Sequence, residues 1–449
     1  YGICQARRID LYPALGAKWL RNGFQTWQAL KEGDQFDFSQ WDEIFEEAKK
    51  AGVRVMPLLA LQNCREQFSE NGEFRFPPKS PALVKKAARI LLDRYVEKYG
   101  ITHVEVINEP NLFLFFRHKE GTKDYEEFID KVLIPASEVI REYGCKVVAP
   151  SITVEWPADA WPAREETYDR CFNLNWCKKA VDDWLSYHDA WKYIDYFGLH
   201  YIKGDTEKPM VPYADNLIPL YDHFKEKWID TGKIEGVWNT EEGLTAVEAG
   251  NLGQVTLEPW ETTPTGQWVP RYFVPVIDWA ARNGWKDADQ YKVFWYHTSG
   301  KHWVLEPTCL LDRSNDDAMQ DTGKAYSILT SLFADVEQFD APDETAQVGF
   351  GLHPQDRSQW NFFAPHLFKS YTFDLDRTKL VVAWTDLPGL GTKGPNLQAT
   401  LPWSGEVPQV ERIDYLTGER EKLEASVTDG TLVIEIPRRD QPVVYLRIS

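Results

Sequence analysis

The sequence predicts an α/β protein: a (β/α)₈ (TIM) barrel over residues 1–335, followed by a small C-terminal antiparallel β-sandwich domain over residues 336–449. Three observations predict this architecture. Short apolar runs alternate with amphipathic stretches through the first three quarters of the chain, that helical pattern then ends, and alternating strand-like runs separated by Gly, Asp and Pro turns follow it. A chain of 449 residues also exceeds one ordinary core, which favours two domains.

Eight short apolar runs are the expected barrel strands, because each has the length of a buried strand and each is followed by a longer helical pattern. In order they are YGIC 1–4, KWLRNGF 18–24, VRVMPLLAL 53–61, HVEVIN 103–108, KVVAPSI 146–152, YFGLHYI 196–202, GVWNTEE 236–242 and KVFWYH 292–297. Two long segments rich in Trp, Pro, Gly and Glu follow the fifth and seventh runs, at 153–178 and 243–270. Loops after barrel strands surround the active-site end of such barrels, so we expect these segments to form walls there.

The stretches between the runs carry helix signals. Apolar residues in 39–52 recur at i, i+3, i+4 and i+7, as Trp41, Ile44, Phe45 and Ala48, which predicts an amphipathic helix. In 80–100, Ser80 is a plausible N-cap and Gly100 lies just past the expected end. The stretch 324–336 is the expected last barrel helix.

The expected strands of the C-terminal domain include KLVVAWTDL 379–387, ERIDYL 411–416, TLVIEI 431–436 and VVYLRI 443–448. No low-complexity linker precedes them, so the two domains are expected to pack directly. We expect the sandwich to support the barrel, and a separate carbohydrate-binding role is the alternative.

Composition excludes several classes of protein. The formal net charge of −19 argues against a nucleic-acid partner, and no apolar run is long enough to span a membrane. No signal peptide is visible after Tyr1, and the compartment stays open between a secreted or periplasmic location and the cytoplasm. The six cysteines show no metal-site spacing, although Cys171 and Cys177 could form a disulfide. We expect neither a metal nor a cofactor, and the oligomeric state stays open.

Tryptophan is the compositional outlier. Of 19 Trp residues, 13 lie between Trp156 and Trp303. Most buried Trp residues belong to a core. Trp rings also stack on the C–H faces of sugars, so this concentration favours a lined carbohydrate cleft.

The stretch VEVINEPN, 104–111, begins as a buried strand and ends in polar residues. Asn108 and Glu109 close the run, and Pro110 disfavours the helical region for the residue before it, so Glu109 is expected to be extended. This pattern indicates a carboxylate held at a strand end. The alternative is an ordinary rim residue.

A second acidic strand end lies in GVWNTEEG, 236–243, with Glu241 and Glu242. Glycoside hydrolysis needs two carboxyl groups, one to protonate the leaving oxygen and one to attack the anomeric carbon or activate water. The alternative is that both are rim carboxylates paired with basic residues. That alternative does not predict that both follow the carboxyl end of a barrel strand.

These motifs resemble those of the clan A glycoside hydrolases, in which Asn-Glu-Pro follows strand four and Thr-Glu-x-Gly follows strand seven. VEVINEPN is most like the E-x-x-NEPN version of family 39. The resemblance implies that Glu109 is the general acid/base, that Glu241 is the nucleophile and that Asn108 bonds the sugar 2-hydroxyl. It favours Glu241 over Glu242, and strand alternation would point Glu242 to the opposite face.

The resemblance extends to three other strands. GAKWLRNGF, IDYFGLHYI and VFWYH are similar to the second, sixth and eighth strands of the clan. It implies that Arg21 and Tyr201 bond the nucleophile, that His200 lies in the site and that Trp295 forms the floor of the sugar site. Each of these could instead be a rim or core residue. The chain departs from the pattern at the end of strand three, LLALQN, and at Ile107, which leaves the exact family open.

The sequence therefore predicts a retaining glycoside hydrolase that acts on β-linked sugars of oligo- or polysaccharides, with a carbohydrate as its partner. A catalytically silent glycan-binding barrel is the alternative. No GxSxG or HExxH motif supports a serine or zinc hydrolase. The sugar, and the choice between exo and endo action, stay open.

Overall fold

The protein is described by a computed structural model. It describes residues 1–24, 26–30, 35–60, 69, 72, 75–112, 115–119, 121–154, 174–203, 213–244, 265–284, 289–299, 309–334, 349–352, 368–375, 378–385, 397–437 and 443–449. Most of the two long segments after the fifth and seventh predicted strands, 155–173 and 245–264, lies outside the described residues, so their expected role as walls stays a prediction.

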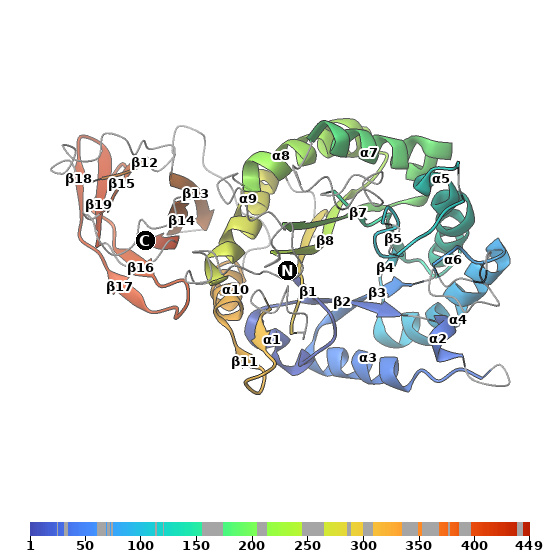
Figure 1. Ribbon diagram of the computed structural model, residues 1–449. Helices are drawn as coiled ribbons and strands as arrows, with labels where there is room; N and C mark the ends of the chain where they lie inside the picture. The colour runs from blue at the N-terminus through green and yellow to red at the C-terminus, as the bar shows by residue number, and fades with distance from the viewer. Residues whose placement is uncertain are drawn as a thin grey trace, which may run out of the picture.

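The first part of the chain forms a closed parallel barrel, as predicted (Figure 1). Its sheet has the order β5-β4-β3-β2-β1-β9-β8-β7-β6 and closes through a β5–β7 pairing. The strands are β1 Gly2–Cys4, β2 Trp19–Phe24, β3 Arg54–Leu59, β4 His103–Val106, β5 Lys146–Val148, β6 Ile152–Thr153, β7 Tyr196–Lys203, β8 Gly236–Leu244 and β9 Tyr291–Trp295. Each predicted run coincides with its strand to within two residues at either end, and only the fifth is divided, into β5 and β6.

The divided fifth strand packs tightly on Gly198 of β7. Between β5 and β6, Ser151 has a φ of 51° and lies beside Gly198. A Cβ on Gly198 would lie 2.1 Å from Ser151 Oγ and 2.9 Å from Ser151 Cα. The backbone of the fifth strand therefore leaves no room for a side chain at this position.

Replacing Gly198 by Ala should lower the free energy of unfolding by about 1–3 kcal/mol, because the added methyl overlaps backbone atoms that cannot move alone. Urea unfolding of the variant measures this. Gly23→Ala on β2 is the matched control, because its Cβ would meet nothing closer than Leu58 Cδ2 at 3.9 Å. Equal stabilities of the two variants would contradict the proposed clash.

Helices surround the barrel (Figure 1). They are α1 Tyr12–Leu15, α2 Thr26–Ala29, α3 Ser39–Ala51, α4 Pro81–Tyr99, α5 Asp124–Phe128, α6 Ile134–Glu142, α7 Leu174–Ser186, α8 Tyr213–Phe224, α9 Trp268–Arg282 and α10 Asp321–Leu332. The predicted stripe of α3 buries Trp41, Phe45 and Ala48. Ser80 is the N-cap of α4 but its side chain accepts no capping hydrogen bond, and Gly100 ends that helix in the left-handed conformation. No described helix is long and apolar enough to cross a membrane.

Strand alternation separates two layers of side chains. The barrel interior is filled by Cys4, Trp19, Met56, Val148, Tyr196, Trp238 and Phe294. The outward-facing residues of the same strands pack against the helices; on β7 these are Phe197, Leu199 and Tyr201. The two faces of each strand therefore have different functions, and a register error of one residue exchanges them.

The C-terminal part forms two antiparallel sheets, as predicted. One has the order β12-β15-β19-β18 and the other β13-β14-β20-β16-β17. The strands are β12 Gly349–Leu352, β13 Phe368–Leu375, β14 Thr378–Thr385, β15 Leu397–Pro402, β16 Val410–Ile413, β17 Arg420–Lys422, β18 Ala425–Thr428, β19 Thr431–Ile436 and β20 Val443–Ile448. A short hairpin, β10 Leu311–Asp312 and β11 Ala318–Met319, precedes α10.

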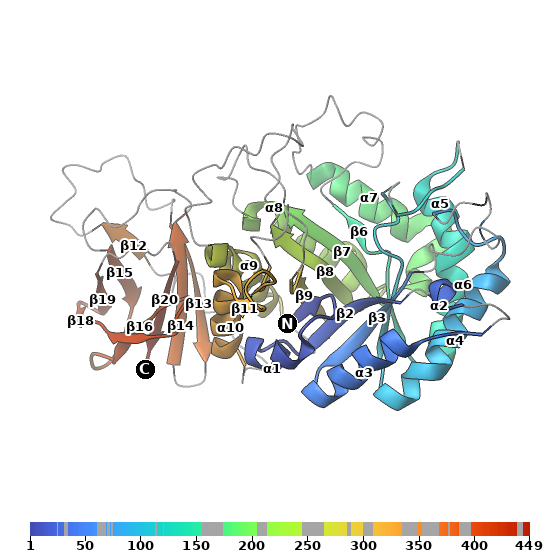
Figure 2. The ribbon, with the colours of Figure 1, turned by 60° about the horizontal axis from the view of Figure 1, so that its bottom comes forward.

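The five-stranded sheet is buried on both faces. Val381 and Ala383 of β14 pack against the four-stranded sheet, whereas the alternating Leu380, Val382 and Trp384 belong to the core that continues into the barrel. In both views α9 and α10 lie between the barrel strands and this sheet (Figure 1, Figure 2). The domains thus pack directly. The predicted boundary at residue 335/336 lies outside the described residues and stays a prediction.

Candidate active site

The loop after β4 turns Glu109 into the barrel mouth. Ile107 and Glu109 both have positive φ, 60° and 42°, so the expectation of an extended Glu109 is wrong. The backbone N–H of Glu109 donates to the carbonyl oxygen of Ser151 at 3.1 Å, which connects the turn to the divided fifth strand. The Asn111 amide bonds the backbone of Thr153 in both directions, at 2.9 and 3.2 Å. The Glu109 carboxylate is therefore held by a turn fixed to the neighbouring strand.

A β-bulge in β8 places Glu241 in the barrel. His200 pairs with Glu241 while Leu199 pairs with Asn239, so Thr240 is the additional residue. As a result Thr240 and Glu241 both have contacts inside the barrel. The buried Glu242 instead accepts a hydrogen bond from the amide of Asn239, a neighbour three residues earlier on the same strand. Glu241, and not Glu242, thus faces the site.

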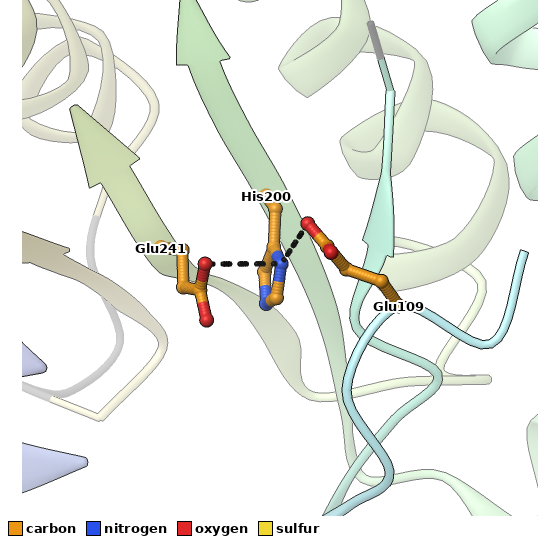
Figure 3. A group of neighbouring side chains, drawn as sticks. All are labelled: Glu109, His200 and Glu241. Carbon is orange, nitrogen blue, oxygen red and sulfur yellow. Dashed lines mark hydrogen bonds and ion pairs between the residues drawn. The ribbon is translucent and has the colours of Figure 1, made fainter. Parts of the chain in front are cut away.

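His200 lies between the two candidate carboxylates (Figure 3). Its Nδ1 is 2.9 Å from Glu109 Oε1 and 3.7 Å from Glu241 Oε2. Its Nε2 lies 3.0 Å from Thr240 Oγ1. The side chain is completely buried. Its ring contacts both the carboxylate that follows β4 and the carboxylate on β8.

Arg21 connects the remaining polar groups of the site. Its guanidinium donates to Glu241 Oε1 and to both carboxylate oxygens of Glu105. Its Nη2 also donates to Asn108 Oδ1 at 2.8 Å. Because Arg21 is only 4% exposed, these partners replace water around its charge.

The charges of this network shift the pKa values of its own members. Burial alone would lower the pKa of His200, but the negative charge of Glu241, the nearby Glu105 and the bond to Glu109 raise it to about 9. Burial would raise the pKa of Glu105, but the charge and hydrogen bonds of Arg21, with the nearby His200, lower it to about 2. Burial raises the pKa of Glu241, against the charges of His200 and Arg21. At neutral pH we therefore infer a charged Arg21–His200–Glu105 centre next to the two candidate carboxylates.

The structure was compared with known proteins. No family model and no curated protein matches the sequence. A family 39 glycoside hydrolase from the gut symbiont Bacteroides cellulosilyticus WH2 has a TM-score of 0.61 at 16% identity, over 100% of this chain and 80% of that one. A family 30 subfamily 8 xylanase from Clostridium acetobutylicum has a TM-score of 0.55 at 13% identity, over 100% and 95%. A family 44 xyloglucanase from Paenibacillus polymyxa has a TM-score of 0.53 at 12% identity, over 100% and 95%.

The chain has the fold of the clan A glycoside hydrolases. The structure brings five residues expected in the site into one cluster formed by β2, the turn after β4, β7 and β8: Arg21, Asn108, Glu109, His200 and Glu241. At these low identities the likeness concerns the fold. The roles of the five residues stay proposals.

Two site expectations are corrected. Trp295 is fully buried between the barrel and α9, with ring centroids 5.8 Å from Tyr272 and 6.1 Å from Phe273, so it offers no face to a sugar. Tyr201 belongs to the same outer layer, on the face of β7 opposite His200. Both predictions fail for one reason: strand alternation points these side chains to the helices.

Three residues of the barrel interior near the site were not predicted from the sequence. Tyr296, one position after Trp295, faces the interior, and Gln5 donates to its hydroxyl at 3.3 Å. The residues Glu105 and Thr240 are buried beneath the site and bonded to each other. A signal for Glu105 exists, because it is the one acidic residue within the apolar run VEVI. Tyr296 could have been found only from the correct strand register.

Glu109, His200 and Glu241 could also hold a metal ion, because each offers one ligand atom within 4.8 Å of the others. His200 and Glu241 already have other partners: the raised pKa of His200 favours a protonated ring, and Arg21 bonds Glu241. Both effects oppose cation binding. That the protein needs no metal stays a prediction, which the activity assay below tests.

Proposed function

We propose that the protein is a retaining glycoside hydrolase that cleaves β-linked sugars by double displacement. The observation that supports this most is the pair of buried carboxylates from β4 and β8. Oxygen atoms of Glu109 and Glu241 lie within 4.8 Å of each other, with the His200 ring beside both. Retaining enzymes hold the two groups about 5–5.5 Å apart, whereas inverting enzymes need about 6.5–9.5 Å for a water molecule.

In the proposed reaction, Glu109 protonates the glycosidic oxygen while Glu241 attacks the anomeric carbon. A covalent glycosyl-enzyme forms and the leaving group departs as an alcohol. Glu109, now ionised, removes a proton from water, which displaces Glu241 and releases the sugar with its configuration retained.

The remaining residues of the site have supporting roles in this proposal. The bond from Arg21 stabilises the anion of Glu241, which favours Glu241 as the nucleophile. The cation on His200 stabilises whichever of the two glutamates is ionised at each step, because its Nδ1 faces both. The amide of Asn108 lies between Arg21 and Glu109 and would bond the sugar 2-hydroxyl.

A catalytically silent glycan-binding barrel is the second candidate. A silent relative has no need for the charged partners of Glu241, because binding alone does not require an ionised nucleophile. The bonded Arg21, Glu241 and Glu105 therefore favour an enzyme.

A panel of aryl β-glycosides separates these candidates and identifies the sugar. We expect turnover of at least one member among xyloside, glucoside, galactoside, glucuronide and mannoside, with retention seen by NMR of the first-formed sugar. Turnover should be the same in EDTA. Binding of glycans without turnover of any substrate would support the silent barrel, and activity lost in EDTA and restored by a divalent cation would show a metal site.

A further inference from the structure

Glu105 is a buried carboxylate that the proposed reaction does not use. It lies in the middle of β4, pairs along the backbone with Leu58 and Val148 of the adjacent strands, and is completely inaccessible to solvent. It precedes Glu109 by four positions and lies below the proposed acid/base. A buried carboxylate is costly unless opposite charges and hydrogen bonds compensate for the lost water.

Its partners come from three other strands of the barrel. Arg21 of β2 donates through Nε to one oxygen and through Nη2 to the other at 3.1 Å, which fixes the plane of the guanidinium. Thr240 of β8 donates its hydroxyl at 2.9 Å, directly before Glu241 in the chain. His200 Nε2 of β7 is 3.9 Å away. Glu105 thus contacts the two basic residues, Arg21 and His200, that also contact Glu241.

The charges around the site balance only when Glu105 is ionised. Arg21 and His200 supply two positive charges at neutral pH. Double displacement requires that Glu109 and Glu241 together hold one proton, and hence one negative charge. Glu105 supplies the second negative charge. Without it, the excess positive charge would favour loss of the proton that the reaction needs.

We propose that Glu105 is a positioning residue with two functions: it orients Arg21 toward Glu241, and its negative charge keeps one proton on the Glu109–Glu241 pair. This inference rests on the proposed glycosidase function and extends it to a residue that does not touch substrate.

The other titratable groups that face this centre do not supply the missing charge. Burial raises the pKa of the Cys4 thiol and that of the Tyr296 hydroxyl, so both are neutral at physiological pH. The inner faces of β3 and β5 contribute the apolar Met56 and Val148. Among the residues that the structure describes, the titratable groups that face this centre are Cys4 of β1, Arg21 of β2, Glu105 and Glu109 of β4 and its following turn, His200 of β7, Glu241 of β8 and Tyr296 after β9.

The first test is the pH dependence of kcat/KM. Glu105→Gln keeps the shape of the side chain and removes its charge, so both limbs of the profile should move to lower pH by about one unit or more. The loss of Arg21 orientation should also lower kcat about 10²-fold. Glu105→Asp retains the charge and should lower kcat while both limbs stay in place. A lower kcat with unmoved limbs in Glu105→Gln would show a structural role only.

Glu127→Gln is the matched control. Glu127 is also buried and paired with a cation, Lys131, but lies on α5 outside the barrel strands. Its replacement should leave the profile unchanged. A shift of the limbs equal to that of Glu105→Gln would show that any buried charge in this protein has the effect, and would overturn the proposal.

The second test needs no turnover. NMR of ¹⁵N-histidine protein, with the His200 signal assigned by its loss in His200→Asn, should show a lower titration midpoint for His200 in Glu105→Gln than in the wild type. The double variant Glu105→Gln/Arg21→Met removes both members of a buried pair of opposite charges, so it leaves no unpaired charge and should fold even if the single variant does not. In the double variant the titration midpoint of His200 should return toward that of the wild type. An unchanged midpoint in both variants would overturn the proposal. A shifted midpoint in a protein that cleaves no glycoside would contradict the proposed function and leave the role of Glu105 in the charge balance intact.

Discussion

Replacing Glu241 by Ala should abolish turnover of every glycoside, with a loss on the order of 10⁴- to 10⁶-fold in kcat. The reason is that no covalent intermediate can form without the nucleophile, however good the leaving group is. The substitution also leaves the Nη1 of Arg21 without its carboxylate partner. Steady-state kinetics on aryl glycosides with good and poor leaving groups measure the effect.

Glu242→Gln is the control for this variant, because the two residues are adjacent on β8 and differ in the face to which they point. Its amide oxygen can still accept the hydrogen bond from Asn239, so most activity should remain. If Glu242→Gln were as inactive as Glu241→Ala, the assignment of the nucleophile would be wrong by one residue.

Replacing Glu109 by Ala should have an effect that depends on the leaving group. A dinitrophenolate needs little protonation as it departs, so the first step should be nearly normal with such a substrate and slow by several orders of magnitude with a poor leaving group. The second step then lacks its general base, and azide, which needs no deprotonation, should restore turnover and give a β-glycosyl azide. Product NMR identifies that azide and its configuration.

A variant of His200 is the control for the acid/base assignment of Glu109. The His200 ring contacts Glu109 and Glu241 but is not itself expected to transfer a proton to the sugar. The His200→Asn variant should therefore lose activity equally on good and poor leaving groups and should not respond to azide. An equal loss on both classes of substrate in Glu109→Ala, without rescue, would contradict the acid/base assignment.

Most of the fold could be predicted from the sequence because apolar periodicity determines it. Each barrel run coincides with its strand to within two residues at either end, and three of the four predicted stripe residues of α3 are buried, with Ile44 half-buried. The division of the fifth strand into β5 and β6 was not predictable, because it depends on the contact of Ser151 with Gly198, two residues that are 47 positions apart in the chain.

Residues whose position a short motif fixes cluster in the structure, although their roles stay predictions, and two residues placed by likeness to strand ends lie outside the cluster. Asn108, Glu109 and Glu241 lie in short motifs, and the structure brings them together. Trp295 and Tyr201 were assigned by likeness to strand ends, and both lie one residue away from the side chain that faces the interior, Tyr296 and His200. A β-bulge such as that at Thr240 also shifts the alternation, and no local pattern in GVWNTEEG signals it.

The role of Glu105 depends on tertiary structure. Its signals in the sequence are the first position of the E-x-x-NEPN pattern and a charge within an apolar run, and neither names its partner. The partners Arg21, His200 and Thr240 come from β2, β7 and β8, and only closure of the barrel brings them to one carboxylate.

The central claim is that Glu241 forms a covalent bond to the sugar. The most direct measurement is peptide mass spectrometry of the wild-type protein after reaction with a 2-deoxy-2-fluoro glycoside of the sugar found in the panel, because the fluorine slows hydrolysis of the intermediate more than its formation. We expect one adduct on the peptide that spans Val237 to Gly243, with fragment ions that place it on Glu241. An adduct on Glu242, or inactivation without any covalent adduct on this peptide, would contradict the double-displacement account.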